Sequence, residues 1–282
     1  MKKWLFIFLF AVAAGSIYLF LSAKSPVEKV ITIKANISAA NRCFLDTASW
    51  GKWWPRQYTY RIRGLFYNEV RLSIPGWGKG ERPVSLRIVQ LSQDSILLGW
   101  DGGLPADARA GMDTILKAFR SFVEDTRNIY GFRFLKTISK DSTLITLTSI
   151  EGSYPSTDYI YRKIDTLSAY AASGGANVIN YPMMNVTGLG AGRFRIMIAL
   201  SLDKTLEQAG RIVIKRFVPW KMIEGEVKGG DSCVSRALQQ LYYFRDDQRL
   251  SIMALPFQSL VTDRRKEQDS TKWVTKVCAP IS

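Results

Sequence analysis

The second half of the chain contains an internal repeat, and this feature constrains the fold more than any other. From Asn128 onward, similar segments recur at a spacing of about 77 residues. Each copy shows the same order of predicted elements, namely a strand, a helix and two further strands. A duplicated β-α-β-β unit can join its two sheets and leave a cleft across the pseudo-twofold axis, a usual place for a small-molecule site.

The two copies match segment by segment. In the first copy, the corresponding segments are the predicted strand 143–149, the segment 180–188 (NYPMMNVTG) and the predicted strand 193–202. In the second copy, they are the predicted strand 211–218 and the segments 254–263 (ALPFQSLVTD) and 272–281. The predicted helices carry apolar residues at i, i+4 and i+7, which are Ile160, Ile164 and Leu167 in the first copy and Ala237, Leu241 and Phe244 in the second. Pro182 corresponds to Pro256, but three residues out of phase. The glycine-rich segment 188–192 lies between two predicted strands, which indicates a hairpin turn rather than a nucleotide-binding loop.

The start of the chain is predicted to cross a membrane. Residues 4–21 contain no charge, and 18 residues at 1.5 Å each just span a hydrocarbon core of about 30 Å. A cleavable signal peptide is the alternative, but the run is longer than a usual signal sequence, and Leu21 stands where a cleavage site favours a small residue. We therefore favour an uncleaved anchor with its tether over 1–26. Lys2 and Lys3 indicate that the N-terminus lies in the cytoplasm and that the rest of the chain lies outside the cytoplasmic membrane, although Lys24 and Lys29 on the other flank weaken this indication.

Pattern changes divide the rest into two domains, 27–128 and 129–282, and both mix helices with strands, so the fold class is α+β. The first domain begins with a strand in 27–37 and a short helix through Ala39 to Leu45. Four strand-like runs follow, at 58–63, 69–74, 84–91 and 95–100. A long helix from Ala106 closes the domain, with one apolar stripe made of Met112, Ile115, Leu116, Phe119, Phe122 and Val123.

This element order, with the segment TASWGKWWP at 47–55, resembles the START/polyketide-cyclase superfamily (SRPBCC, helix-grip fold). The resemblance covers 27–128 and implies an apolar ligand held between the sheet and the long helix. The candidate lining residues are then Trp50, Trp54, Trp100, Phe119 and Phe122. The alternative is that these aromatic side chains are plain hydrophobic core.

The second domain resembles a gyrase-inhibitor-like effector-binding domain. The resemblance rests on EGSYPS (151–156), EVKGG (226–230), the segment 254–281 and the doubled element order. It implies a cleft for small, often cationic or amphipathic molecules, walled by aromatic residues and containing one buried carboxylate. The family's key glutamate falls at Gln258, whose neutral amide supplies no counter-charge. The remaining candidate ligand-binding residues are Glu151, Tyr154, Tyr159, Tyr181, Trp220, Phe257 and Trp273.

Composition excludes several kinds of chemistry. The chain has 39 Lys and Arg against 24 Asp and Glu, for a formal net charge of +15, and it has no histidine. Without imidazole there is no Ser-His or Cys-His nucleophile and no His-containing zinc site. The three cysteines are far apart, which indicates small buried apolar residues rather than a disulfide framework or a metal site. The scattered acids Asp101, Asp107, Glu124 and Asp125 indicate surface charge.

The positive charge does not point to nucleic acid, because no nucleic-acid-binding motif is present and basic residues alternate with acidic ones. Residues 264–266 (RRK) form the most conspicuous basic cluster, and a solvated surface near anionic lipid is the favoured interpretation.

The leading hypothesis is a membrane-anchored, non-catalytic protein that binds a small apolar or amphipathic ligand, with no metal and no cofactor. A cyclase or hydrolase that uses Glu151 with Tyr154 is the first alternative, since a buried carboxylate and a tyrosine can exchange protons without histidine. A structural partner domain with an exposed apolar patch and no pocket is the second.

Overall fold

The computed structural model describes residues 29–77, 83–101, 103–139, 143–216 and 220–282. The chain divides into two compact units, with the division between Ile129 and Tyr130. Both units combine antiparallel sheets with few helices, so the predicted α+β class is confirmed. The predicted membrane anchor at 4–21 lies outside the described residues. Among the residues that are described, no helix is both long enough and apolar enough to cross a membrane.

The first unit contains a five-stranded antiparallel sheet in the order β1-β5-β4-β3-β2. Its elements are β1 (Lys29–Ile33), α2 (Ile37–Leu45), the 3-10 helix η1 (Thr47–Lys52), β2 (Arg61–Phe66), β3 (Glu69–Ser73), β4 (Val84–Ser92), β5 (Ser95–Asp101) and α3 (Ala106–Glu124), followed by α4 (Thr126–Tyr130) at the division. The long helix α3 packs on this sheet with its apolar stripe buried, and the alternate residues of each strand face it.

One strand of the first unit begins later than predicted. The run 58–63 was expected to form a strand, but β2 begins at Arg61. The backbone N–H of Tyr58 donates to Pro55, and the Tyr58 carbonyl accepts from the Trp54 indole at 2.7 Å. The Tyr58 ring also packs edge-to-face on Trp77. Residues 58–60 therefore close the aromatic core instead of joining the sheet ladder.

Asp101 is not the surface charge that its scattered position indicated. Its residue is only 6% exposed, at the end of β5, and its carboxylate lies 3.3 Å from the Arg87 guanidinium. The same guanidinium donates to Glu69 at 2.9 Å, so Arg87 bridges two carboxylates on the sheet face away from the core. Burial raises the pKa of Asp101 and Glu69 adds to that effect, whereas the charge of Arg87 opposes it.

Replacing Asp101 with asparagine should change how stability depends on pH. The pKa of Asp101 is raised in the folded state. Its contribution to the free energy of unfolding is therefore fully present at a pH below the pKa of an ordinary aspartate, and it is lost as the pH rises through the pKa of the folded state. Relative to wild type, Asp101→Asn should therefore gain free energy of unfolding as the pH rises from about 3 to 6. Urea denaturation across this range measures the difference. Asp94→Asn, at an exposed turn, is the control and should show no such gain.

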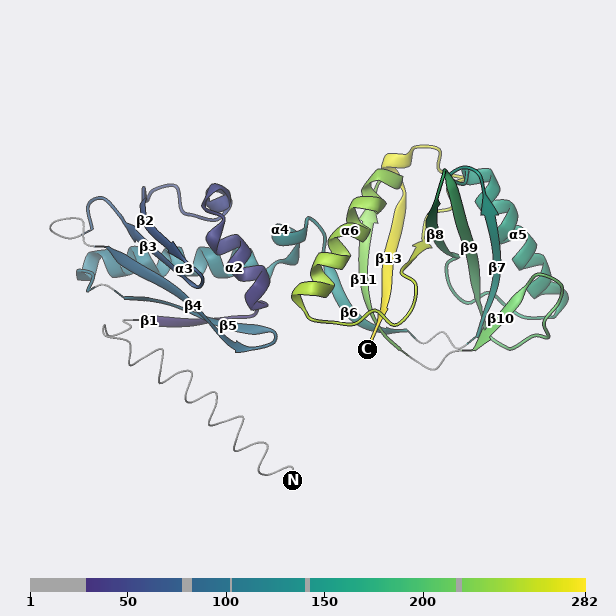
Figure 1. Cartoon of the computed structure of the whole chain (residues 1–282), viewed down its shortest axis with the longest axis horizontal. Helices are drawn as coiled ribbons and strands as arrows, with labels where there is room; N and C mark the ends of the chain where they lie inside the picture. The colour runs from purple at the N-terminus through teal and green to yellow at the C-terminus, as the bar shows by residue number, and fades with distance from the viewer. Residues whose placement is uncertain (1–28, 78–82, 102, 140–142, 217–219) are drawn as a thin grey trace, which may run out of the picture. The chain divides into compact units, whose positions relative to one another are not determined.

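The second unit contains an eight-stranded antiparallel sheet, and its elements are β6 (Phe134–Ser139), β7 (Thr143–Glu151), α5 (Thr157–Ser173), β8 (Met183–Gly190), β9 (Arg193–Leu202), β10 (Val213–Arg216), β11 (Trp220–Lys228), α6 (Asp231–Asp247), β12 (Phe257–Leu260), the 3-10 helix η2 (Ser270–Lys272) and β13 (Val274–Ile281). The strand order is β10-β7-β9-β8-β12-β13-β11-β6, which reads symmetrically about the β8–β12 pair. Figure 1 shows α5 beside β7 and α6 beside β11 and β13.

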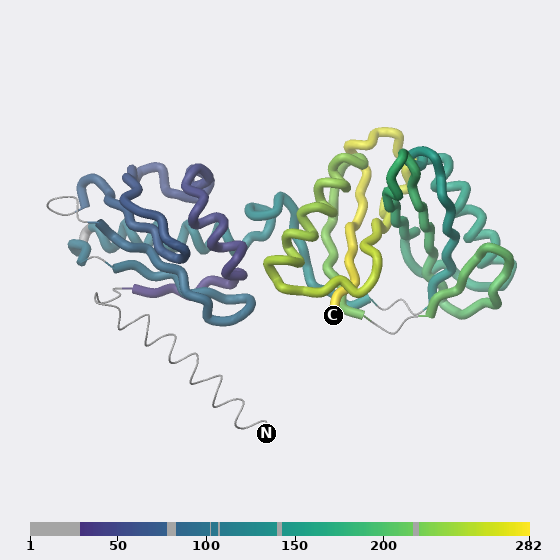
Figure 2. The backbone as a smooth tube through the Cα atoms, in the orientation of Figure 1, coloured from purple at the N-terminus to yellow at the C-terminus, as the bar shows by residue number. Residues whose placement is uncertain are grey.

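The edge strands are exchanged between the two halves of this sheet. β6 precedes β7 in the chain but pairs with β11, and β10 precedes β11 but pairs with β7. Figure 2 shows the teal β6 beside the green β11. Each half therefore supplies the outer strand of the other half, so backbone hydrogen bonds at both edges join the two halves.

The structure corrects the predicted strand at 211–218. The strand that precedes α6 is β11 (Trp220–Lys228), and 213–216 form the short separate strand β10. Charged residues on β11 concealed its pattern, since one of its faces carries ion pairs such as Glu224 with Lys276 at 2.9 Å. With β7 and β11 aligned, the three-residue difference between the copies lies in the turn before each helix, 152–156 in one copy and 229–230 in the other.

Residues in antiparallel register share one face of a sheet, so both helices can be placed on the same face. Met184 pairs with Ile198 on β9 and with Gln258 on β12, and Gln258 pairs with Val277 on β13. Ile198 belongs to the core under α5, and β13 packs against α6. The predicted helix stripes are buried on this face, and segment 188–192 forms the hairpin turn between β8 and β9, as predicted.

Gly225 on β11 should not tolerate a side chain. A Cβ at this position would lie 2.6 Å from the ring of Phe134, its partner on β6, and that ring is buried against Phe244. Gly225→Ala should therefore lower the free energy of unfolding by about 1–3 kcal/mol through overpacking. Chemical denaturation followed by circular dichroism measures the loss. Gly152→Ala meets open space and should change stability by less than about 0.5 kcal/mol; equal effects of the two substitutions would contradict the overpacking account.

Candidate functional site

A cavity of about 570 Å³ opens on the helix-free face of the eight-stranded sheet. This volume lies within the range of small-molecule sites. The cavity is lined by Leu144, Thr146, Met183, Met184, Asn185, Met197, Ala199, Lys215, Trp220, Met253, Ala254, Leu255, Phe257 and Pro280. The lining is mostly apolar and contains no acidic residue among the residues that the structure describes.

Strand alternation brings these side chains to one face. On β7, Leu144 and Thr146 line the cavity while Ile145 between them belongs to the core under α5. On β9, Met197 and Ala199 line it while Ile198 faces the helix. A residue of a strand lies on the face opposite to its two neighbours, so one sheet supplies both the helix-bearing core and the cavity.

The floor of the cavity is a small apolar cluster. Leu144, Met183 and Ala199 are buried there, and Phe257 packs against them. Met183 and Phe257 come from β8 and β12, the strands that meet at the middle of the sheet. Four methionines line the described cavity, and because methionine side chains are flexible and polarisable, the lining can change its shape.

Most polar groups of the lining already have hydrogen-bond partners. The Thr146 hydroxyl donates to the carbonyl of Val213 at 3.2 Å. The Asn185 amide donates to the carbonyl of Pro256 at 2.7 Å, and its oxygen accepts from Thr187 at 2.9 Å. These groups hold the cavity walls in place and leave little hydrogen-bonding capacity for a ligand.

The predicted ligand-binding residues of the first unit lie in its core. Trp50, Trp54, Trp100 and Phe119 are each at most 5% exposed. The rings of Trp50 and Trp54 stack with centroids 4.9 Å apart, and the Trp50 indole donates to the carbonyl of Phe44 at 2.9 Å. Phe122, at 9% exposed, belongs to the same core cluster. The structure brings these side chains together as packed core, and none of them lines the cavity described above.

The predicted residues of the second unit separate onto two faces. Trp220 and Phe257 line the cavity. Gln258 follows Phe257 on the strand, so it lies on the helix-bearing face, where it is 5% exposed. Its side-chain oxygen has no hydrogen-bond partner among the described residues. Tyr181 is 48% exposed just before β8 and lies outside the cavity lining.

Glu151 meets Tyr159 rather than Tyr154. The Tyr159 hydroxyl donates to the Glu151 carboxylate and lies 2.7 Å from the Ser149 hydroxyl. Burial, followed by the hydrogen bond to Glu151, raises the pKa of Tyr159. The Tyr154 ring instead packs edge-to-face on Phe194. Burial and the nearby Asp231 raise the pKa of Tyr154, whereas Arg264 and Gln258 oppose that shift.

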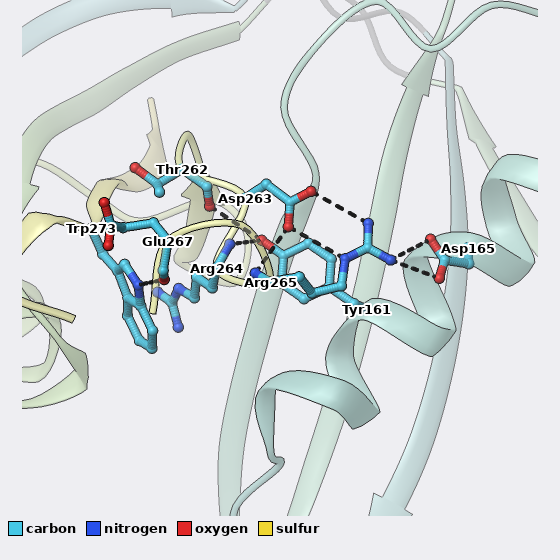
Figure 3. Close-up of polar contacts among 8 residues, drawn as sticks. All are labelled: Tyr161, Asp165, Thr262, Asp263, Arg264, Arg265, Glu267 and Trp273. Atoms are coloured by element: carbon cyan, nitrogen blue, oxygen red, sulfur yellow. Dashed lines mark hydrogen bonds and ion pairs between the residues drawn. The ribbon is translucent and has the colours of Figure 1, made fainter. Parts of the chain in front are cut away.

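On the helix-bearing face, Trp273 is covered by a cation of the protein itself (Figure 3). The Arg264 guanidinium lies 4.5 Å from the Trp273 ring centroid, and its side chain is 2% exposed. It donates to Asp231 at 3.0 Å and to the Thr275 hydroxyl at 3.1 Å. Arg264 is therefore a buried structural residue and not part of a solvated basic patch.

The same loop is also fastened to α5. The backbone N–H of Arg264 donates to the Tyr161 hydroxyl at 2.8 Å, and this hydroxyl donates to the carbonyl of Thr262 at 3.1 Å. Arg265 stacks on the Tyr161 ring at 4.4 Å and pairs with Asp165 at 2.9 Å, as Figure 3 shows. Arg264 and Arg265 thus connect the β12–β13 loop to helices from both halves of the sheet.

Sequence reasoning missed most of the cavity lining. Met183, Met197 and Lys215 were not predicted as site residues, although each lies in a predicted strand or strand-like segment. Segment 211–218 also contains Arg211 and Arg216, so the charge of Lys215 did not distinguish it from its neighbours in the sequence. Which residues share its face depends on strand register, and the sequence does not supply register.

In the part of the chain that the structure describes, no three Cys, Asp or Glu side chains group as metal ligands. Cys278 is buried, as predicted, while Cys43 and Cys233 are partly buried; all three are free thiols.

Comparisons with known proteins leave the family open. No protein-family model matches the chain, and no curated protein matches it. Among solved structures, EcmrR in its complex with DNA is 12% identical over 62% of this chain and 68% of that chain, with a TM-score of 0.48. The EcmrR C-terminal domain is 11% identical over 54% and 98%, with a TM-score of 0.46. The di-domain ARO/CYC protein BexL, from the BE-7585A biosynthetic pathway, is 11% identical over 90% and 84%, with a TM-score of 0.31. At these values the similarities do not assign the chain to a family.

Removing the buried guanidinium should destabilise the second unit far more than removing its neighbour. Arg264→Met leaves Asp231 and Thr275 without their donor and should cost about 2–4 kcal/mol of unfolding free energy. Arg265→Met removes ion pairs to the exposed Asp165 and the partly buried Asp263, and because the Arg265 side chain itself is 43% exposed, the substitution should cost less than about 1 kcal/mol. Urea denaturation of both variants provides the comparison. Similar small losses in both would show that the cluster in Figure 3 does not hold the loop.

Proposed function

We propose that this chain is a membrane-anchored protein that binds a small apolar or amphipathic molecule without transforming it. The cavity on the helix-free face of the second unit carries the proposal. A ligand can bury its apolar surface against the apolar floor of the cavity, which consists of Leu144, Met183, Ala199 and Phe257. Burying apolar surface yields about 25 cal/mol per Å², which is the main source of affinity for such a ligand.

The chemistry of the lining supports binding rather than catalysis. The chain has no histidine, and the hydroxyl and amide groups of Thr146 and Asn185 are engaged with the protein backbone or with a neighbouring side chain. The described lining offers no carboxylate that could act as the base for a hydroxyl nucleophile. The Tyr159 hydroxyl donates a hydrogen bond to Glu151, but this pair belongs to another part of the unit, outside this lining.

The proposal extends to the architecture. We interpret the first unit as a helix-grip domain, on its resemblance to the START/polyketide-cyclase superfamily, and the second unit as a duplicated β-α-β-β effector-binding domain of the gyrase-inhibitor-like kind. The symmetrical strand order of the second unit supports the latter interpretation. The uncharged run 4–21 supports a single-pass anchor in the cytoplasmic membrane, with the body outside the cytoplasm. We propose no nucleic-acid partner.

Filling the cavity should abolish binding. The test uses the full-length chain in lipid nanodiscs and 1-decanol as a neutral amphipathic probe. In wild type, probe at one hundred times its dissociation constant should raise the free energy of unfolding by about 2.7 kcal/mol. Ala199→Phe places a ring on the cavity floor and should remove this stabilisation. Thermal unfolding with and without the probe measures the effect.

Ala172→Phe is the matched control, because this residue is exposed on α5 and lies outside the cavity lining. Ala172→Phe should keep the full response to 1-decanol. An equal response in Ala199→Phe, once circular dichroism shows that this variant is folded, would place any bound probe outside the cavity and overturn the proposal.

A further inference from the structure

Among the described lining residues, one charged side chain lies in the wall of the mostly apolar cavity. Lys215 is on β10, directly opposite Leu144 on β7, and this register turns it to the face that the cavity occupies. The residue is partly buried. An ammonium group in an apolar wall is costly unless an acceptor or a negative charge faces it.

The protein supplies only a weak acceptor for this ammonium. The one hydrogen bond of Lys215 among the described residues runs to the Met197 sulfur at 3.6 Å, and thioether sulfur is a poor acceptor. None of the ion pairs between described residues includes Lys215. The cavity thus combines an apolar floor with a positive group that the described lining does not neutralise.

Charge complementarity then decides which amphipathic molecules fit. A cationic ligand would bring a second positive charge next to Lys215 with no carboxylate in the described lining to offset it. An anionic group would gain a charge-assisted hydrogen bond that strengthens away from water. The helix-bearing face of the sheet does not offer a cation an alternative site of this kind. Gln258 is neutral on that face, and the Trp273 ring is already covered by Arg264.

We propose that the cavity binds an apolar acid, with its hydrocarbon body on the apolar floor and its carboxylate facing the Lys215 ammonium. This proposal rests on the proposed function and names the class of its ligand. The expected selectivity runs from carboxylate to neutral alcohol to quaternary ammonium among molecules with the same hydrocarbon chain. The Lys215 ammonium, rather than the aromatic residues of the described lining, sets this order.

The experiment measures binding of three probes to the full-length chain in nanodiscs, with empty nanodiscs as the blank. Equilibrium dialysis gives the dissociation constants of decanoate, 1-decanol and decyltrimethylammonium. Wild type should bind decanoate at least tenfold more tightly than decyltrimethylammonium. Lys215→Met should weaken decanoate binding about tenfold and leave 1-decanol unchanged, because only the acid uses the charge.

Two further variants separate a charge effect from a structural one. Lys215→Glu should reverse the preference, so that decyltrimethylammonium binds more tightly than decanoate, which loss of packing alone would not produce. Lys221→Met is the matched control. This lysine is exposed on β11 in register with Ile281 rather than in the cavity lining, so its removal should leave all three affinities unchanged.

The outcomes distinguish this inference from the proposed function. If the three probes bind equally in wild type and Lys215→Met, or if decyltrimethylammonium binds best in wild type, the apolar-acid inference is wrong while the binding function stands. If none of the three probes binds the wild-type chain above the nanodisc blank, both the inference and the proposed function are overturned.

Discussion

The cavity depends on the short pairing of β8 with β12, which joins the two halves of the eight-stranded sheet. Only Met183 and Met184 pair there with Ser259 and Gln258. The backbone N–H of Leu260 extends the seam by donating to Pro182 at 2.8 Å. Because the cavity floor takes Met183 from one half and Phe257 from the other, the site exists only while this seam holds.

Two features outside the seam reinforce it. The exchanged edge strands β6 and β10 join the halves at both edges of the sheet through backbone hydrogen bonds. On the helix-bearing face, the Arg264 guanidinium donates to Asp231 at the start of α6, and the Arg264 backbone N–H donates to the Tyr161 hydroxyl on α5. Arg264 therefore links the two helices. The aromatic and charged residues of that face therefore stabilise the sheet, whereas the cavity lies on the opposite face.

Much of the fold could be predicted, because burial periodicity records it. The stripe on α3 and the stripes on α5 and α6 are buried as their spacing indicated. β11 was missed, since charged residues on its solvated face masked the apolar alternation. Of the candidate site residues, Trp220 and Phe257 line the cavity, whereas neighbouring Gln258 points to the other face because adjacent residues of a strand alternate. Aromatic content could not separate core from site, so Trp50 and Trp54 are placed in packed core.

The sequence by itself determined the α+β class, the repeat, the uncharged run at 4–21 and the absence of imidazole chemistry, because composition and periodicity act locally along the chain. Only the tertiary structure decided that Lys215, Met183 and Phe257 line one hollow and that Arg264 covers Trp273. These contacts join residues far apart in the chain. They follow from strand register and from the exchange of edge strands, and neither leaves a signature in local sequence.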